Sequence, residues 1–293
     1  MRLTAQYFER YKQAAETALK IELGEEVGAS LFTASQVYRV KDSNSVCYIS
    51  FSPQRTSPAT WDRRAAPPVS TLWPCLERWT RIRLSDGWIQ VEVQTACQTS
   101  LMATGILRSD IAYGPDAANI DLFLIKLERS LALLGSTPSS PAMSVDYFTR
   151  RVSDAGVSDV PGFVTDQREW VTGHGDLNWS NVSMDAELID WATWGRLPRW
   201  LDLATLWCYS LPNPQLAASI ERRAEQLVGG FGDRGIVMFE YARLFIIGDV
   251  FHASRNWPVY STFVDQCGPE LHESQSRIVS TIHRMRATGY TSH

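Results

Sequence analysis

The residues best suited to chemistry lie close together, within residues 171–204. His174 and Asp176 share a short segment with two glycines, and Asn181 follows shortly after them. Asp190 comes after two apolar residues, and Asp202 opens the next apolar run. Carboxylates can accept a proton from a reacting group, and carboxylate and amide oxygens are the ligands that Mg²⁺ prefers. This stretch is therefore the candidate site for acid–base chemistry assisted by a metal ion.

The spacing of these residues resembles that of aminoglycoside phosphotransferases and choline kinases, which share the protein-kinase fold. The catalytic loop of that family has the pattern His-x-Asp-x-x-x-x-Asn, and His174, Asp176 and Asn181 match it. Leu188-Ile189-Asp190-Trp191 is similar to the metal-binding strand that follows in the family, and Asp202-Leu203-Ala204 is similar to its next helix start. Such a combination arises from composition alone in roughly one chain in several thousand, so the resemblance is fairly specific.

The resemblance implies a role for each of these residues in phosphoryl transfer from ATP to a hydroxyl. Such transfer requires mainly positioning and charge stabilisation from the protein. Asp176 is then expected to accept the proton of the attacking hydroxyl, while Asn181 and Asp190 hold Mg²⁺. His174 and Asp202 are expected to hold the backbone of the catalytic loop in shape. The implied cofactors are ATP and Mg²⁺.

The first third of the chain reads as one helix followed by a small sheet. Apolar residues recur at helical spacing over residues 4–21. Short alternating runs flank a polar four-residue link and a Ser-Asp-Gly turn, which predicts two β-hairpins. The predicted strands are residues 36–40, 46–51, 79–84 and 88–93. Residues 52–74 hold several prolines, which break helices, so we expect no long helix there.

The remainder of the chain is predicted to be mainly helical. The predicted helices are residues 117–135, 146–155, 201–211, 214–229, 236–253 and 270–287. A turn at Asp185-Ala186 predicts a short hairpin after the catalytic loop. We therefore expect an α+β, two-lobed, protein-kinase-like fold. Residues 1–96 would form a small β-rich N-lobe, and residues 97–293 a larger helical C-lobe with the catalytic loop and the substrate site.

The N-terminal part departs from the family. Ser50 stands where the family has a strand lysine that binds the phosphates, and no glutamate occurs between Glu26 and Glu77 to act as its partner. Both halves of that ion pair are absent together, which avoids leaving one buried charge unpaired. Gly28-Ala-Ser30 lies near the place of the phosphate loop but lacks its glycine pattern. By the resemblance, Ser50, Gln94 and Ala96 are the candidate nucleotide-binding residues, the last two in a linker that faces the adenine.

Composition excludes several classes of function. The net charge is −4 and no basic run is present, which argues against nucleic-acid binding. No apolar run approaches the ~20 residues of a membrane span, so we expect no membrane partner and a cytoplasmic location. The five scattered cysteines fit reduced thiols in packed positions rather than a metal site.

Three functions remain open at the level of sequence. The first is a kinase that phosphorylates a hydroxyl of a small molecule, such as an antibiotic, an amino alcohol or a sugar. Residues 203–293 hold as many arginines as acidic residues, which makes a polycationic aminoglycoside less favoured. The second is a Ser/Thr kinase that acts on a precursor peptide together with a partner lyase. The third is a pseudokinase scaffold, which the missing lysine favours and the intact Asp176, Asn181 and Asp190 oppose.

Overall fold

The chain divides into two compact units, residues 1–98 and residues 99–293. The computed structural model describes residues 5–30, 35–52, 76–85, 87–96 and 120–288. The first unit holds a small antiparallel sheet with one helix, and the second is mainly helical. The predicted two-lobed α+β architecture is therefore confirmed.

The N-terminal unit is a five-stranded antiparallel sheet preceded by a helix. Its strands run in the spatial order β1-β2-β3-β5-β4. The elements are α1 (Ala5–Leu19), β1 (Leu23–Ser30), β2 (Ser35–Val40), β3 (Ser45–Ser52), β4 (Leu76–Leu84) and β5 (Gly87–Thr95). Both predicted hairpins are confirmed, because β2 pairs with β3 and β4 pairs with β5, each antiparallel.

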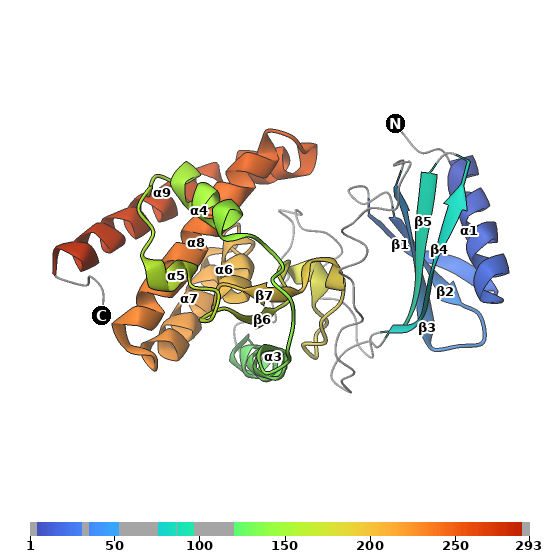
Figure 1. The fold of residues 1–293 in the computed structure, drawn as a ribbon, viewed down its shortest axis with the longest axis horizontal. Helices are drawn as coiled ribbons and strands as arrows, with labels where there is room; N and C mark the ends of the chain where they lie inside the picture. The colour runs from blue at the N-terminus through green and yellow to red at the C-terminus, as the bar shows by residue number, and fades with distance from the viewer. Residues whose placement is uncertain (1–4, 31–34, 53–75, 86, 97–119, 289–293) are drawn as a thin grey trace. The chain divides into compact units, whose positions relative to one another are not determined.

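Helix α1 covers one face of this sheet (Figure 1). Alternate residues of β5, namely Ile89, Val91 and Val93, point into a shared apolar core and are fully buried. The ring of Tyr11 in α1 stacks on Phe51 of β3, with 4.9 Å between ring centroids. The alternation of the strands thus gives the sheet one apolar face, which α1 closes.

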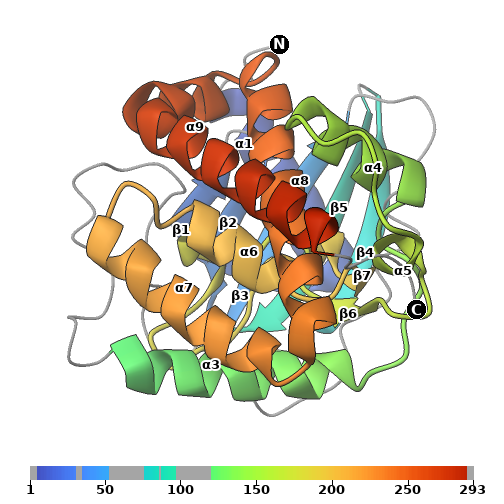
Figure 2. The same cartoon turned by 90° about the vertical axis from the view of Figure 1, so that its left-hand side faces the viewer.

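The C-terminal unit is built around one buried helix, α8. Its elements are α3 (Ile120–Gly135), α4 (Val145–Asp154), α5 (Gly162–Thr165), β6 (Val171–Gly173), β7 (Gly195–Leu197), α6 (Leu201–Cys208), α7 (Pro214–Gly229), α8 (Gly232–Ser254) and α9 (Pro258–Ala287). Helices α4, α6, α7 and α9 all pack against α8 (Figure 2). Apolar side chains surround most of α8, as expected for a helix buried on several sides.

Capping residues set the starts of two of these helices. The Ser144 hydroxyl accepts the Tyr147 N–H at 3.1 Å and begins α4. The Asn213 side chain accepts the Leu216 N–H at 3.2 Å, and Pro214 occupies the first turn of α7. Each side chain satisfies a backbone donor that the first helical turn would leave unpaired.

The structure corrects three expectations about elements. Strand β1 was not predicted, because its two glycines and adjacent glutamates break the alternation of a strand; Gly28-Ala-Ser30 is therefore the end of β1. Helix α9 begins at Pro258 rather than at residue 270, and it continues through a kink at Cys267 and past Pro269. Strands β6 and β7 pair with each other and were also missed. Residues 53–75, which hold nearly all of the proline-rich stretch, lie outside the described residues.

Two further observations bear on the expected class of protein. Cys47, Cys208 and Cys267 are buried free thiols. Among the residues that the structure describes, none forms a helix long and apolar enough to cross a membrane.

The packing of α4 on α8 yields a prediction. A methyl group on Gly248 would overlap the carbonyl oxygen of Arg151, a backbone atom that cannot move aside cheaply. We expect Gly248→Ala to lower the free energy of unfolding by about 1–3 kcal/mol, which is the usual cost of overpacking a core. Thermal unfolding should show a decrease of several degrees.

Gly229→Ala is the matched control, because nothing lies within 4 Å of the added methyl group and the site is helical. It should leave the melting temperature unchanged or raise it slightly. Equal melting temperatures for the two variants would show that α4 does not approach α8 this closely.

Candidate active site

The catalytic-loop segment lies between β6 and a short 3-10 helix, η1 (Trp179–Asn181). Strand β6 ends at Gly173, so His174 and Asp176 emerge directly from the β6–β7 pair. The Trp179 indole N–H donates to the Ser210 hydroxyl at 2.9 Å, which ties η1 to the turn that directly follows α6. Both ends of the loop are therefore attached to regular structure.

Asp202 holds the start of the loop from the first turn of α6. Its Oδ2 accepts the His174 N–H at 2.8 Å, and its Oδ1 accepts the Gly175 N–H at 2.8 Å. The carboxylate is buried. Burial raises the pKa of Asp202, while the His174 ring and the two N–H donors oppose that rise. The structure thus places Asp202 against the catalytic-loop backbone.

His174 connects the loop to the segment that carries Asp190. Its Nε2 lies 2.6 Å from the carbonyl oxygen of Ile189, which can only accept, so Nε2 carries the proton. Its Nδ1 then faces the Asp176 N–H, at 3.4 Å. The ring packs against Trp191, with centroids 4.9 Å apart. A fully buried imidazole therefore fixes the two segments relative to each other.

The glycines on either side of His174 are required by close approaches. A methyl group on Gly173 would meet Asp202 Oδ2 at 2.6 Å. Gly175 has φ +83°, and a methyl group there would meet the Thr193 carbonyl oxygen at 2.5 Å. Thr193 also donates from its hydroxyl to the His174 carbonyl at 3.1 Å. Sequence reasoning did not identify these contacts, although two glycines beside a candidate catalytic residue are a signal of tight backbone packing.

The Asp176 carboxylate is held by two side-chain amides. The Asn178 Nδ2 donates to its Oδ1 at 3.2 Å, and the Asn181 Nδ2 donates to its Oδ2 at 3.2 Å and to its carbonyl at 2.8 Å. Burial and the charge of Asp190 raise the pKa of Asp176 from 3.8 to about 7, and the two amides oppose that rise. Asn178 and Asn181 therefore both orient the candidate base.

Asp190 is exposed and has a left-handed backbone conformation, with φ 59° and ψ 67°. A hydrogen bond from the Ile189 N–H to the Asn181 carbonyl, at 3.0 Å, brings its segment beside the catalytic loop. The strand expected at 188–191 is reduced to a single bridge between Val182 and Leu188. A residue held in this conformation stores strain, which is common at functional sites.

The donor set fits a magnesium ion that also binds substrate oxygens. Asn181 turns its amide nitrogen to Asp176, which leaves its amide oxygen and the exposed Asp190 carboxylate as hard ligands. Within the described residues, no group of three or more His, Cys, Asp or Glu side chains could enclose a metal. Mg²⁺ commonly uses one or two protein ligands together with water and phosphates, so two oxygen ligands suffice.

The other predicted residues lie in the N-terminal unit. Ser50 is in β3, which pairs with β2 and β5. Gln94 is a buried residue of β5 whose side chain donates to Glu92 at 3.1 Å. The Ala96 N–H donates to the Asn44 carbonyl at 2.9 Å. The nucleotide-binding role of these three residues stays a prediction.

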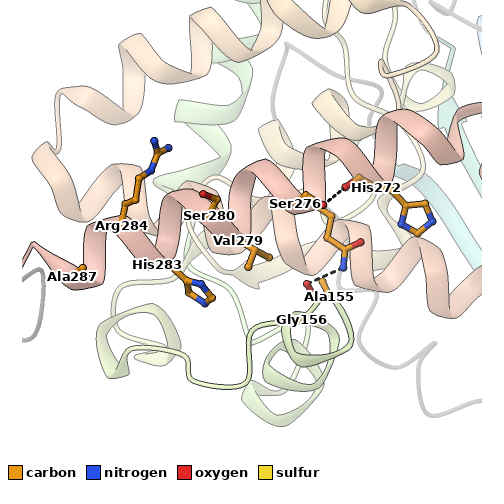
Figure 3. Close-up of a pocket in the computed structure, with 10 residues that line it drawn as sticks. Ala155, Gly156, His272, Ser276, Val279, Ser280, His283, Arg284 and Ala287 are labelled. Atoms are coloured by element: carbon orange, nitrogen blue, oxygen red, sulfur yellow. Dashed lines mark hydrogen bonds between the residues drawn. The ribbon is translucent and has the colours of Figure 1, made fainter.

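A separate hollow lies away from the catalytic loop. It has a volume of about 840 Å³ and is formed by α9 and the end of α4 (Figure 3). His272, Ser276 and His283 of α9 line it, and Gln275 donates across it to the Ala155 carbonyl at 3.1 Å. None of the candidate catalytic or metal-binding residues belongs to its lining.

Comparisons with known proteins place the fold. No protein-family model and no curated protein sequence matches the chain. Among solved structures, a thermostable mutant of aminoglycoside phosphotransferase APH(4)-Ia, in a ternary complex with AMP-PNP and hygromycin B, has 10% sequence identity and a TM-score of 0.56. That match covers 96% of this chain and 99% of the other. A putative aminoglycoside phosphotransferase from Ralstonia eutropha has 11% identity and a TM-score of 0.51, covering 95% of this chain and 99% of the other. The chain thus has the fold of aminoglycoside phosphotransferases, as its catalytic-loop residues predict.

The raised pKa of Asp176 predicts a pH-dependent stability. A carboxyl with a raised pKa destabilises the fold when ionised, so the penalty is absent at low pH and complete above about pH 7. Asp176→Asn removes that charge. In the absence of ligand, its melting temperature relative to the parent should rise between pH 4.5 and pH 8, by roughly 2–4 °C for each kcal/mol of relief. Asp185→Asn, on the neighbouring turn, is the control for a lost exposed charge, and a similar trend for both variants would contradict the raised pKa of Asp176.

The backbone of Asp190 yields a second prediction. Glycine adopts a positive φ without strain, so Asp190→Gly should keep or increase the stability of the ligand-free protein, by up to about 1 kcal/mol. Asp185 is outside the set of residues with positive φ, so Asp185→Gly should lower stability by roughly 0.5–1 kcal/mol. Chemical denaturation measures both, and a larger loss in Asp190→Gly would show that position 190 is unstrained.

Proposed function

We propose that this protein is an ATP-dependent phosphotransferase that moves the γ-phosphate to a hydroxyl of a small molecule. The observation that carries the proposal is the arrangement around Asp176. Its carboxylate is oriented by two amides, lies beside Asp190, and sits on a loop whose backbone is held by Asp202. Such an arrangement can position a hydroxyl, accept its proton and place a metal-bound phosphate next to it.

Asp176 would hold the acceptor hydroxyl by a hydrogen bond to its carboxylate. As the hydroxyl oxygen forms its bond to the γ-phosphorus, the bond from that phosphorus to the bridging oxygen of ADP breaks, and the hydroxyl proton passes to Asp176. A pKa of about 7 suits a group that must both accept and release a proton near neutral pH. Mg²⁺, held by Asp190 and Asn181, would neutralise the triphosphate charge.

The charges of the C-terminal unit support an acceptor that is not strongly cationic. Glu221 pairs with Arg243 and Arg277, each at 2.9 Å. Asp249 lies 3.5 Å from Arg151 Nε, and its carboxylate also accepts the Tyr147 hydroxyl. These acidic residues are already compensated within the unit, so they offer little attraction to a polycation. We therefore favour a neutral or singly charged hydroxyl compound, such as a sugar or an amino alcohol. Because the proposed reaction uses ATP, we propose that the protein acts in the cytoplasm.

The test is transfer of labelled γ-phosphate from Mg·ATP to a panel of sugars, amino alcohols, aminoglycosides and serine-containing peptides. Asp176→Asn keeps the size of the side chain but removes its charge. It should lower turnover by about 10²–10⁴, the usual effect of losing a general base, while affinity for nucleotide stays nearly unchanged. Asp185→Asn is the matched control and should retain full turnover.

Three outcomes of this assay would replace the proposal. Phosphorylation of peptides alone would identify a peptide kinase. Transfer that survives in Asp176→Asn would remove the assigned base. The absence of any Mg²⁺-dependent nucleotide binding by the parent protein would indicate a scaffold with a retained loop.

A further inference from the structure

On the face of the N-terminal sheet opposite α1, two polar side chains of β5 are buried. Along β5, Gln90, Glu92 and Gln94 alternate with the three apolar residues that contact the α1 side. Gln90 and Gln94 are only 3% and 6% exposed. A solvated sheet face would leave such residues open to water, so the part of the face around Gln90 and Gln94 is not an ordinary solvent-exposed surface.

These side chains form a centre rich in hydrogen-bond acceptors. The amide nitrogens of Gln90 and Gln94 both donate to the Glu92 carboxylate. The amide oxygens of the two glutamines are buried and have no hydrogen-bond partner among the described residues. An unsatisfied buried acceptor lowers stability, and such groups in a native fold commonly mark a place for a ligand or ordered water. The negative Glu92 in this setting favours a cation beside it.

The strand register places one arginine in this position. Ser50 of β3, Gln90 of β5 and Arg81 of β4 are direct partners in one row across the sheet. With neighbouring strands ~4.8 Å apart, Arg81 stands about 10 Å from Ser50, on the same face. Glu92 is the diagonal neighbour of Arg81, within reach of a long side chain.

Several other cations in the described part of the N-terminal unit suit this role less well. Arg39 is exposed and pairs with Glu25 at 3.4 Å. Arg83 is exposed, and its guanidinium lies 5.9 Å from the centre of the Trp88 ring, near the end of β4. Lys12 lies over the Tyr38 ring and Lys41 pairs with Glu22. Arg81 is instead half-buried and stands beside the acceptor centre.

We propose that Arg81, oriented by Glu92, is the side chain through which the N-terminal sheet binds the phosphates of the nucleotide. This inference rests on the proposed phosphotransferase function, which requires a cation for a highly charged triphosphate. Ser50 carries no charge, and an arginine in its row can supply one. A guanidinium binds phosphate through two parallel hydrogen bonds, and a neighbouring carboxylate keeps its planar group in place.

The experiment measures the affinity of Mg·AMP-PNP, Mg·ADP and adenosine by calorimetry. Charge-assisted hydrogen bonds predict that Arg81→Gln weakens the two phosphate-bearing ligands by roughly 10–100-fold and leaves adenosine unchanged. Arg83→Gln, on the same strand and face, is the matched control and should bind all three ligands like the parent. Glu92→Gln should weaken Mg·AMP-PNP to a smaller extent.

A rescue variant separates a direct role from a structural one. Ser50→Lys combined with Arg81→Gln places a new cation in the same row and should recover most of the lost affinity for Mg·AMP-PNP. If Arg81→Gln does not fold, Arg81→Lys keeps the charge without the two parallel hydrogen bonds and should show an intermediate affinity.

The outcomes distinguish this inference from the proposed function. If the parent binds Mg·AMP-PNP and Arg81→Gln binds it equally well, the role of Arg81 is overturned and the phosphotransferase proposal stands. Equal weakening of adenosine and Mg·AMP-PNP would also overturn the inference, because it indicates a general loss of structure. A parent that binds no Mg²⁺–nucleotide complex would overturn both.

Discussion

The candidate catalytic centre depends on one buried carboxylate. Asp202, in the first turn of α6, reaches back along the chain to the N–H groups of His174 and Gly175. Those two bonds fix the backbone immediately before Asp176. The His174 side chain in turn donates to the Ile189 carbonyl and so holds the segment that carries Asp190. Desolvating a carboxylate is costly, and two backbone donors at 2.8 Å offset much of that cost. Three separate segments of residues 171–204 are thereby assembled around a single anion.

The same region contains several backbone conformations that are unfavourable for the residues that adopt them, or that leave no room for a side chain. Asp190 and Trp200 have positive φ without being glycine, and Gly175 has φ +83° against the Thr193 carbonyl. Trp200 directly precedes the helix that presents Asp202, so its strained backbone sets the position from which that carboxylate reaches the loop. Natural sequences break local rules mainly where function requires it, and the clustering here agrees with the site assigned from the spacing of the loop.

Much of the fold could be predicted from periodicity, and the failures have physical reasons. The β2–β3 and β4–β5 hairpins were found because alternating runs flank short polar turns. Strand β1 was missed because backbone pairing with β2 overrides the poor preference of its glycines and glutamates. Strands β6 and β7 have three residues each, too few for any periodic signal. The candidate site residues followed from a family pattern, whereas the amide contacts of Asp176 and the left-handed Asp190 depend on tertiary packing that no local pattern encodes.

Strand β5 shows that alternation of apolar and polar residues does not by itself identify the solvent-exposed face of a sheet. Its apolar residues meet α1, and the same alternation would normally assign its polar residues to solvent. Instead, Gln90 and Gln94 are buried around a carboxylate, with carbonyl oxygens that no described residue satisfies, an arrangement that lowers stability. In the C-terminal unit, Asp176 lowers stability in a similar way when it is ionised, because burial raises its pKa. Desolvated polar groups thus occur in both units. In the C-terminal unit they lie on the loop that would bind the acceptor hydroxyl in the proposed reaction. In the N-terminal unit they lie on β5, next to the strand whose Arg81 would bind the phosphates.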